Sequence, residues 1–275
     1  MSERILQLEH ISYAYPEEAL AIDDLNVSIH KGERIAVLGR NGAGKSTFFL
    51  LCNGILEPSQ GNIYLNGRLL TRRKKDLLEL HRQVGIVFQE ADNQICAVTV
   101  EGEVSFGPMN LRLPMEAVEK KTQAALARMG LEGYESRSPQ YLSGGEKKRV
   151  TIADILAMEP SLILLDEPTA SLDPENVERL EKTLDELTQA GIALAVSTHD
   201  VDFAARFAKR GLVFIQGRLM ADDSLSRIFS DETLLRQAGL RKPWIWQAAE
   251  AMCPGEETYP MTREQLLRWK PENRR

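Results

Sequence analysis

The chain has 275 residues, of which 43% are hydrophobic and 27% charged, and its formal net charge is −6. This composition is normal for a soluble globular protein and excludes a fibre or a disordered tail. The densest basic run, residues 72–75, is short, which argues against a protein that holds nucleic acid by neutralising phosphates.

The sequence also gives no sign of export or of a membrane span. No stretch approaches the roughly 18 to 20 consecutive apolar residues that cross a bilayer. Residues 1–9 carry charges where a signal peptide needs an apolar segment, so we expect a cytoplasmic protein. Cys52, Cys96 and Cys253 have no paired spacing, which predicts neither a disulfide framework nor a zinc site.

The first predicted core element is an apolar strand at residues 34–38, followed by a glycine-rich turn and a helix at 45–52. The turn has the spacing of a phosphate-binding P-loop. Its glycines let backbone N–H groups surround phosphates, while Lys45 reaches the β and γ phosphates and the Ser46 hydroxyl ligates Mg²⁺. We therefore predict that residues 39–47 bind the nucleotide. They are Gly39, Arg40, Asn41, Gly42, Ala43, Gly44, Lys45, Ser46 and Thr47.

Downstream of this turn the pattern changes twice. Residues 61–65 resemble a strand and are followed by Asn66-Gly67, a dipeptide that favours a tight hairpin turn, so an antiparallel β layer should flank the core. After a short strand at 84–88 the pattern becomes helical, with helices expected at 115–129 and 145–158. We interpret residues 90–160 as an inserted helical subdomain.

Two acids follow the next apolar run, residues 162–165. Asp166 and Glu167 stand at the end of this predicted buried strand, which is where ligands bind in open α/β sheets. Asp166 suits Mg²⁺, directly or through water, and Glu167 suits a general base that polarises the attacking water. Two incidental acids at a solvated strand end are the alternative.

The remaining pattern indicates a parallel sheet and a helical tail. Residues 174–190 form an amphipathic pattern that Gly191 ends, and the apolar run 192–196 follows at once. Continuous apolar runs joined by helices are typical of a doubly wound α/β core. We expect the strands to stop at about Met220, and therefore a main domain at 1–220 and a helical appendage at 221–275.

A further motif indicates the family. Leu142, Ser143, Gly144, Gly145 and Glu146 resemble the signature motif of ABC (ATP-binding cassette) ATPases. Ser143 and the glycine N–H groups before a helix form an anion site. In that family two subunits pack head to tail, so the resemblance implies that Ser143, Gly144 and Gly145 serve the γ-phosphate bound by the partner. It implies a P-loop NTPase fold, ATP hydrolysis, and ATP with Mg²⁺ as ligands.

Other family elements occur in the expected order. Gln89 after the strand at 84–88 is similar to the Q-loop glutamine, Asp173 in Ser171-Leu-Asp-Pro to the D-loop, and His199 to the switch histidine. The resemblance implies catalytic roles for Glu167, His199, Lys45 and Gln89, with Mg²⁺ held by Ser46, Gln89 and Asp166. It also implies a contact of Asp173 with the partner's nucleotide.

The adenine base has two candidate aromatic partners near the N-terminus. Tyr13 and Tyr15 both resemble the residue that stacks on adenine in this family. We choose Tyr15 because it directly precedes Pro16.

The regions at 87–111 and 228–243 resemble ATPase subunits of energy-coupling-factor importers, most of all the cobalt-importer type. The resemblance implies a homodimer or paralogous heterodimer at the cytoplasmic face of the cell membrane, attached to a membrane coupling subunit and through it to a substrate-binding membrane subunit. The tail, with Trp244, Trp246 and Trp269, would contribute a dimer contact or pack on its own core. Cobalt or nickel is the expected cargo, with vitamins as the alternative and a soluble non-transport ATPase as a more remote one.

The membrane partner would dock just after Gln89. Ile95, Cys96, Ala97 and Val98 form an apolar stretch in an expected loop, and apolar loop residues favour a docking surface over a core. Core packing is the alternative.

Overall fold

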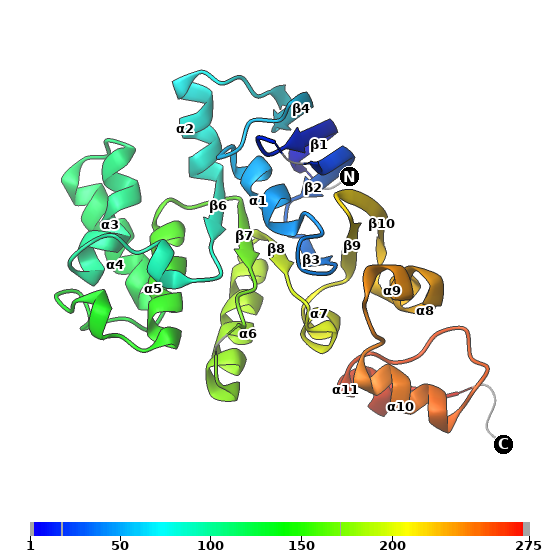
Figure 1. The fold of residues 1–275 in the computed structure, drawn as a ribbon. Coiled ribbons are helices and arrows are strands. Elements are labelled where there is room, and N and C mark those ends of the chain that lie inside the picture. Colours follow the sequence, from blue (N-terminus) through cyan, green and yellow to red (C-terminus); the bar gives the residue numbers. More distant parts are fainter. Residues whose placement is uncertain (1–2, 18, 171, 272–275) are drawn as a thin grey trace.

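The computed structural model describes residues 3–17, 19–170 and 172–271. They form two β-sheets, an inserted group of helices and a helical C-terminal tail (Figure 1). One sheet has the order β10-β9-β3-β8-β7-β6 and the other β2-β1-β4-β5. The strands are β1 (Arg4–Ala14), β2 (Leu20–His30), β3 (Arg34–Leu38), β4 (Gln60–Leu65), β5 (Arg68–Leu69), β6 (Val84–Val87), β7 (Leu162–Asp166), β8 (Ala193–Ser197), β9 (Arg210–Ile215) and β10 (Arg218–Ser224).

The larger sheet has the parallel, doubly covered centre that the apolar runs predicted. Strands β6, β7, β8, β3 and β9 run parallel to their neighbours. Along β3, Ile35 and Val37 belong to one hydrophobic core cluster, and Ala36 and Leu38 to the other. Because both faces of the strand are buried, no polar alternation appears in its sequence. The predicted α/β fold class is therefore confirmed.

The four-stranded sheet is the predicted antiparallel layer. It contains two strands beyond the hairpin from which it was predicted. The hairpin joins β4 to β5, with Asn66 at φ 50° and Gly67 at φ 75°, the left-handed conformations that such a tight turn requires. Strands β1 and β2 complete the layer.

Between β6 and β7 the chain forms the helical insertion, on the left of Figure 1. It contains η1 (Ala91–Asn93), α3 (Val100–Asn110), α4 (Met115–Arg128), η2 (Pro139–Tyr141) and α5 (Gly144–Ala157). The helices expected at 115–129 and 145–158 are thus observed within one residue at each end. Covering the sheets are α1 (Lys45–Asn53), α2 (Lys74–Gln83), α6 (Pro174–Gln189) and α7 (Val201–Phe207).

The expected end of the strands at Met220 is wrong by four residues, since β10 continues to Ser224. This strand lies at the edge of the sheet, exposes alternate residues and contains Asp222 and Asp223, so its sequence lacks the apolar run of a central strand. The helical tail then consists of α8 (Leu225–Ser230), α9 (Glu232–Ala238), α10 (Trp244–Met252) and α11 (Arg263–Arg268).

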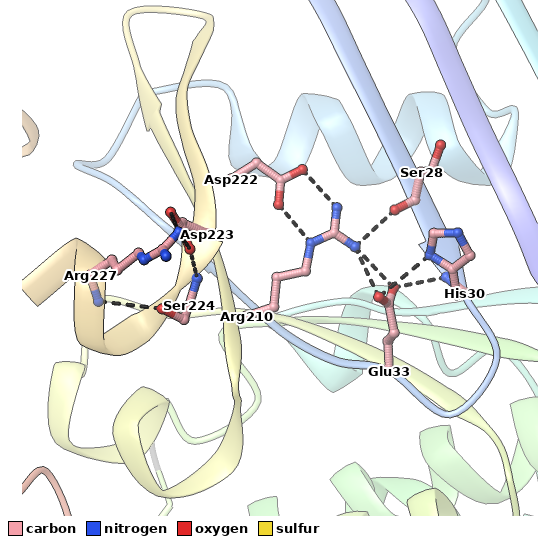
Figure 2. A network of polar contacts seen from close by, with 8 residues as sticks. All are labelled: Ser28, His30, Glu33, Arg210, Asp222, Asp223, Ser224 and Arg227. Atoms are coloured by element: carbon pink, nitrogen blue, oxygen red, sulfur yellow. Dashed lines mark hydrogen bonds and ion pairs between the residues drawn. The ribbon is translucent and has the colours of Figure 1, made fainter. Parts of the chain in front are cut away.

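A polar network around Arg210 joins the two sheets (Figure 2). The Arg210 guanidinium donates two hydrogen bonds to the Asp222 carboxylate, at 2.6 and 2.7 Å. It also donates to the Ser28 carbonyl at 2.9 Å and to Glu33 at 3.0 Å. These bonds hold β9 and β10 against the end of β2 and so fix the antiparallel layer beside the main sheet. In the described part of the chain, no helix has the length and apolar character needed to cross a membrane.

Candidate nucleotide site

A pocket of about 580 Å³ lies at the carboxyl ends of β3, β7 and β8, where the doubly wound topology predicts a ligand. It brings together residues from five predicted motifs that are far apart in the sequence. Ala19, Leu20 and Ala21, which belong to no predicted motif, also line it. The complete lining is Tyr15, Ala19, Leu20, Ala21, Asn41, Gly42, Gly44, Lys45, Ser46, Thr47, Gln89, Asp166, Glu167 and His199.

The turn between β3 and α1 needs glycine at two places for steric reasons. Gly39 has φ 144°, and a Cβ there would lie 2.4 Å from the Phe214 carbonyl oxygen. Gly44, at φ 107°, is the N-cap of α1, and a Cβ would lie 2.8 Å from the Ala21 carbonyl oxygen. The backbone of the turn can therefore curl ahead of the helix N-terminus, which attracts anions.

Lys45 lies inside this turn with only 6% of its surface exposed. Its ammonium donates hydrogen bonds to the carbonyls of Gly39 at 2.9 Å and Arg40 at 3.1 Å. Burial lowers its pKa, against the opposing charges of Glu167 and Asp166. A buried cation whose partners are neutral carbonyls is suited to bind phosphate oxygens that enter the pocket.

The two acids after β7 are held by β8. In the parallel register Asp166 is opposite Ser197, and the Ser197 hydroxyl donates to the Asp166 carboxylate. The same hydroxyl accepts the Glu167 N–H at 3.1 Å. Sequence reasoning missed Ser197, although a polar residue ending a buried parallel strand beside Asp166 was a usable signal.

Glu167 is itself in an unusual environment. Its backbone has φ 43°, a conformation that non-glycine residues adopt with some strain and mostly at functional sites. Its side chain is 90% buried and contacts the exposed His199, with Nδ1 and the carboxylate oxygen 2.9 Å apart. This contact fixes the direction of the carboxylate toward the pocket.

Of the two tyrosines weighed for the base, only Tyr15 lines the pocket. Its hydroxyl lies 3.3 Å from the Thr47 hydroxyl. The Tyr13 ring instead packs on the core and meets the Tyr15 ring edge-on, with centroids 5.0 Å apart. This geometry supports the choice of Tyr15.

Ser46, Gln89 and Asp166, the predicted Mg²⁺ ligands, all line this pocket. They offer a hydroxyl, an amide carbonyl and a carboxylate, the hard oxygen donors that Mg²⁺ prefers. Among the described residues, no group of three or more His, Cys, Asp or Glu side chains could hold a metal alone. The donor set therefore fits an ion that is completed by phosphate oxygens and water.

The signature residues are not part of this pocket. Ser143 is the N-cap of α5 and forms a capping box with Glu146: the Ser143 N–H donates to the carboxylate at 2.8 Å, and the Ser143 hydroxyl accepts the Glu146 N–H at 3.3 Å. Ser143 and Gly144 are exposed, and the neighbouring Tyr141 is 90% exposed. Gly145 is buried against Asn176 of α6. The chain thus presents the signature at an open surface.

Four other predicted contacts, Gly39, Arg40, Ala43 and Asp173, are also absent from the lining of the pocket. Asp173 is exposed and caps α6, where its carboxylate accepts the Asn176 N–H at 2.8 Å, a bond that lowers its pKa. The Arg40 side chain packs on the tail, because a Cβ at Gly239 would lie 2.0 Å from its Nε. Ala43 is buried below the turn. Ser171 of the D-loop pattern is outside the described residues.

Comparisons with known proteins identify the family of the chain. Residues 22–170 match the family model described as ABC transporter. An energy-coupling factor transporter ATP-binding protein of Methanothermobacter thermautotrophicus is 46% identical over 239 residues, which cover 87% of this chain and 77% of that protein. The protein of the same name from Methanocaldococcus jannaschii is 43% identical, with coverage of 90% and 89%.

Solved structures give the same result. The cbiO1 protein of Clostridium perfringens, described as part of the ABC transporter complex cbiONQ, has a TM-score of 0.76 at 38% identity and coverage of 87% of this chain and 96% of that one. A dimeric ATP-binding cassette bound to ADP and phosphate has a TM-score of 0.71 at 28% identity, with coverage of 80% and 99%. With this fold and these relatives, the chain belongs to the ABC transporter ATPases, and within them to the energy-coupling-factor type.

Proposed function

We propose that this ATPase energises a membrane importer and hydrolyses ATP in sites shared by two head-to-tail subunits at the cytoplasmic face of the membrane. One observation carries the proposal. The pocket contains the turn, the acids and His199, whereas the signature end of α5 is exposed and lies outside it. A second subunit is needed to bring a signature to each pocket. The relative that was solved as a dimer with ADP and phosphate supports this arrangement.

Within each pocket the residues take distinct roles. Lys45 and the backbone of residues 39–44 hold the phosphates, and Tyr15 stacks on the base. Glu167 accepts a proton from the attacking water, and its contact with His199 at 2.9 Å holds it in the productive direction. Gln89 and Ser46 present oxygen atoms beside Asp166. Bound Mg²⁺ would supply charge neutralisation for the β and γ phosphates.

The partner's contribution is an anion site. The Ser143 hydroxyl accepts a hydrogen bond from its own helix and keeps its proton free to donate to a γ-phosphate oxygen. Gly144 leaves room for close approach, since nothing lies within 4 Å of a Cβ built on it. Asp173 and the exposed Tyr141 would complete the contact between the two subunits.

The membrane subunit would bind on the helical insertion. Of the apolar stretch at residues 95–98 that was expected to form the docking surface, only part is available. Val98 is 81% exposed, but Ile95 packs against the core, so core packing accounts for that residue. A groove of about 560 Å³ follows between α3 and α4, with the exposed Met109 and Met115 in its lining. Glu101, Glu116 and Glu119 also line it, which suits a basic helix.

The docking experiment combines Val98→Asp with Met109→Asp. Leu69→Asp is the matched control, because Leu69 of β5 is 53% exposed and Met109 is 52% exposed. We expect the double variant to keep the ATPase activity of the isolated dimer and to lose both co-purification with membrane subunits and uptake. Normal co-purification and uptake by the double variant would place the docking surface elsewhere.

For the cargo we propose cobalt or nickel ions, bound by a membrane subunit; a vitamin is the alternative. His10, His30, His81 and His199 are scattered in the sequence, and the described residues contain no metal-binding group of the kind such a cargo would need. Metal and vitamin analysis of the complex purified from membranes decides between the two. Stoichiometric cobalt or nickel supports the proposal, and a bound vitamin without metal contradicts it.

A further inference from the structure

A second buried lysine, outside the nucleotide pocket, joins two functional segments. Lys148 lies one turn into α5 and is 4% exposed. Its ammonium donates to the Phe88 carbonyl at 2.9 Å and to the Gln89 carbonyl at 2.7 Å. These carbonyls lie directly after the short strand β6, in the Q-loop, about sixty residues from Lys148 in the sequence.

The site is built for a cation. Burial lowers the pKa of Lys148 to about 8, while the charges of Glu90 and Asp166 act in the opposite direction. Neither acid forms a direct ion pair with it in the described contacts, so the ammonium is held by the two backbone carbonyls. A buried charge that stabilises only local packing is replaceable by an apolar side chain of similar length, whereas two carbonyls aimed at one position require donors.

The same segment is fastened to α5 at two further points. The Gln94 amide accepts the Phe88 N–H at 3.2 Å and donates to the Thr151 carbonyl of α5 at 3.4 Å. On the outer side, Lys147 pairs with Asp92 at 2.6 Å. The chain from Phe88 to Gln94 thus follows any displacement of the first half of α5.

The two segments that Lys148 connects lie at different places on the subunit. Gln89 lines the chain's own pocket, which Asp166 also lines. The N-terminus of α5 carries Ser143, which is exposed and outside that pocket. We propose that Lys148 is a positioning residue that couples Gln89 in one nucleotide site to the signature that the same subunit offers to the other site. This inference rests on the proposed function, because it needs the signature to act in the partner's site.

The consequence is an effect on turnover without an effect on nucleotide binding. If Lys148 is lost, the turn between β3 and α1 and Lys45 still hold ATP. Gln89 and the signature, however, no longer move as one unit. Misplacement of a positioning element by about 1 Å lowers rates by up to about a hundredfold. Cooperativity between the two sites should fall together with the rate.

The test compares three variants. Lys148→Met removes the donors and keeps the length of the side chain, and Lys148→Arg restores donors and charge. Lys121→Met is the matched control: Lys121 lies on α4 of the same helical insertion and pairs with Glu159 at 2.6 Å, away from the Q-loop. The measurements are the affinity for a fluorescent ATP analogue, kcat, KM, the Hill coefficient for ATP and the thermal unfolding temperature without nucleotide.

We expect Lys148→Met to lower kcat by about ten- to a hundredfold and to bring the Hill coefficient toward one, with ATP affinity close to that of the parent and a lower unfolding temperature, because two buried carbonyls lose their donor. Lys148→Arg should recover part of the rate, and Lys121→Met should behave like the parent. A Lys148→Met enzyme with normal kcat, or one that loses ATP affinity together with kcat, would overturn the inference. If normal kcat is found while subunit mixing still restores activity between other variants, the coupling fails and the shared-site proposal stands.

Discussion

Two buried lysines mark the difference between the P-loop region and the α5 region. Lys45 and Lys148 each donate to two backbone carbonyls, but Lys45 itself lines the pocket and the carbonyls that it binds belong to its own turn. Those bound by Lys148 belong to a distant segment. The first arrangement can exchange its partners for a ligand, and the second cannot do so without separating two elements. One region is therefore suited to bind and the other to transmit.

The largest fall in turnover should come from a change at Glu167, which is proposed neither to bind the nucleotide nor to transmit between sites. Replacing Glu167 with Gln keeps the shape of the side chain and removes the base, so kcat should fall by about 10² to 10⁴ while ATP still binds. The variant should accumulate as an ATP-bound dimer, which size-exclusion chromatography with ATP and Mg²⁺ detects. Turnover close to that of the parent would remove Glu167 from its proposed role.

The binding side of the comparison is tested by Lys45→Ala. A hydrogen bond from a charged group contributes about 1.5 to 3 kcal/mol, so the affinity for ATP should fall by about ten- to a hundredfold. Isothermal titration with ATP and Mg²⁺ measures it. The distinction between the two lysines fails if Lys45→Ala leaves affinity unchanged, or if Lys148→Met weakens it as strongly.

Asp154, on the same helix α5 as Lys148, should make the stability of the protein depend on pH. Burial, with the charge of Glu103, raises the pKa of Asp154 on α5 to about 7 from an ordinary value of 3.8, and a hydrogen bond from Gln94 acts in the opposite direction. Between about pH 4 and pH 7 the unfolded chain releases this proton and the folded chain keeps it. The free energy of unfolding should therefore decrease across that window.

Asp154→Asn removes this contribution, so it should flatten the pH dependence and be more stable than the parent at pH 8, by on the order of 4 kcal/mol. Urea unfolding at pH 5 and pH 8 measures both effects. Glu119→Gln, at an exposed acid of α4, serves as the control. Equal pH dependence in the parent and in Asp154→Asn would contradict the prediction.

The smallest effect should come from the outer ion pair between α5 and η1. Asp92 is 73% exposed in its pair with Lys147, and such surface pairs contribute about 1 kcal/mol or less. Lys147→Met should therefore leave kcat within about twofold of the parent value. A loss as large as that of Lys148→Met would mean that charge near α5, rather than the buried hydrogen bonds, links the two segments.

The binding region was largely predictable because its signals are local. The glycines of the turn are required by backbone sterics within a few residues, and the apolar runs before Gly39 and Asp166 specify buried strands. Parallel topology then brings the strand ends together, which placed Gln89, Asp166, Glu167 and His199 in one pocket. The proposed chemical roles of these residues remain predictions, as does the division into domains at residue 220.

The transmitting region was less predictable because its contacts are long-range. Nothing near Lys148 in the sequence specifies that its ammonium meets carbonyls at residues 88 and 89. In the same way, Ile95 belonged to an apolar stretch expected to be exposed, and only the folded structure shows that it packs against the core. The predicted end of the strands fell four residues too early, because the edge strand β10 exposes alternate residues and lacks the apolar run of a central strand. Such features depend on tertiary contacts that no local pattern encodes.

In the proposed dimer, the pocket of one subunit and the signature of the other make one site. The most direct test mixes Lys45→Ala subunits with Ser143→Arg subunits, each inactive alone. In a mixed dimer one site carries both defects and the other carries none, so ATPase activity should reappear, up to about one quarter of the parent activity for random pairing into two-fold dimers. If no activity reappears at any mixing ratio, although mixed dimers are demonstrated by differential tagging, the pocket and the signature do not form a site shared between subunits.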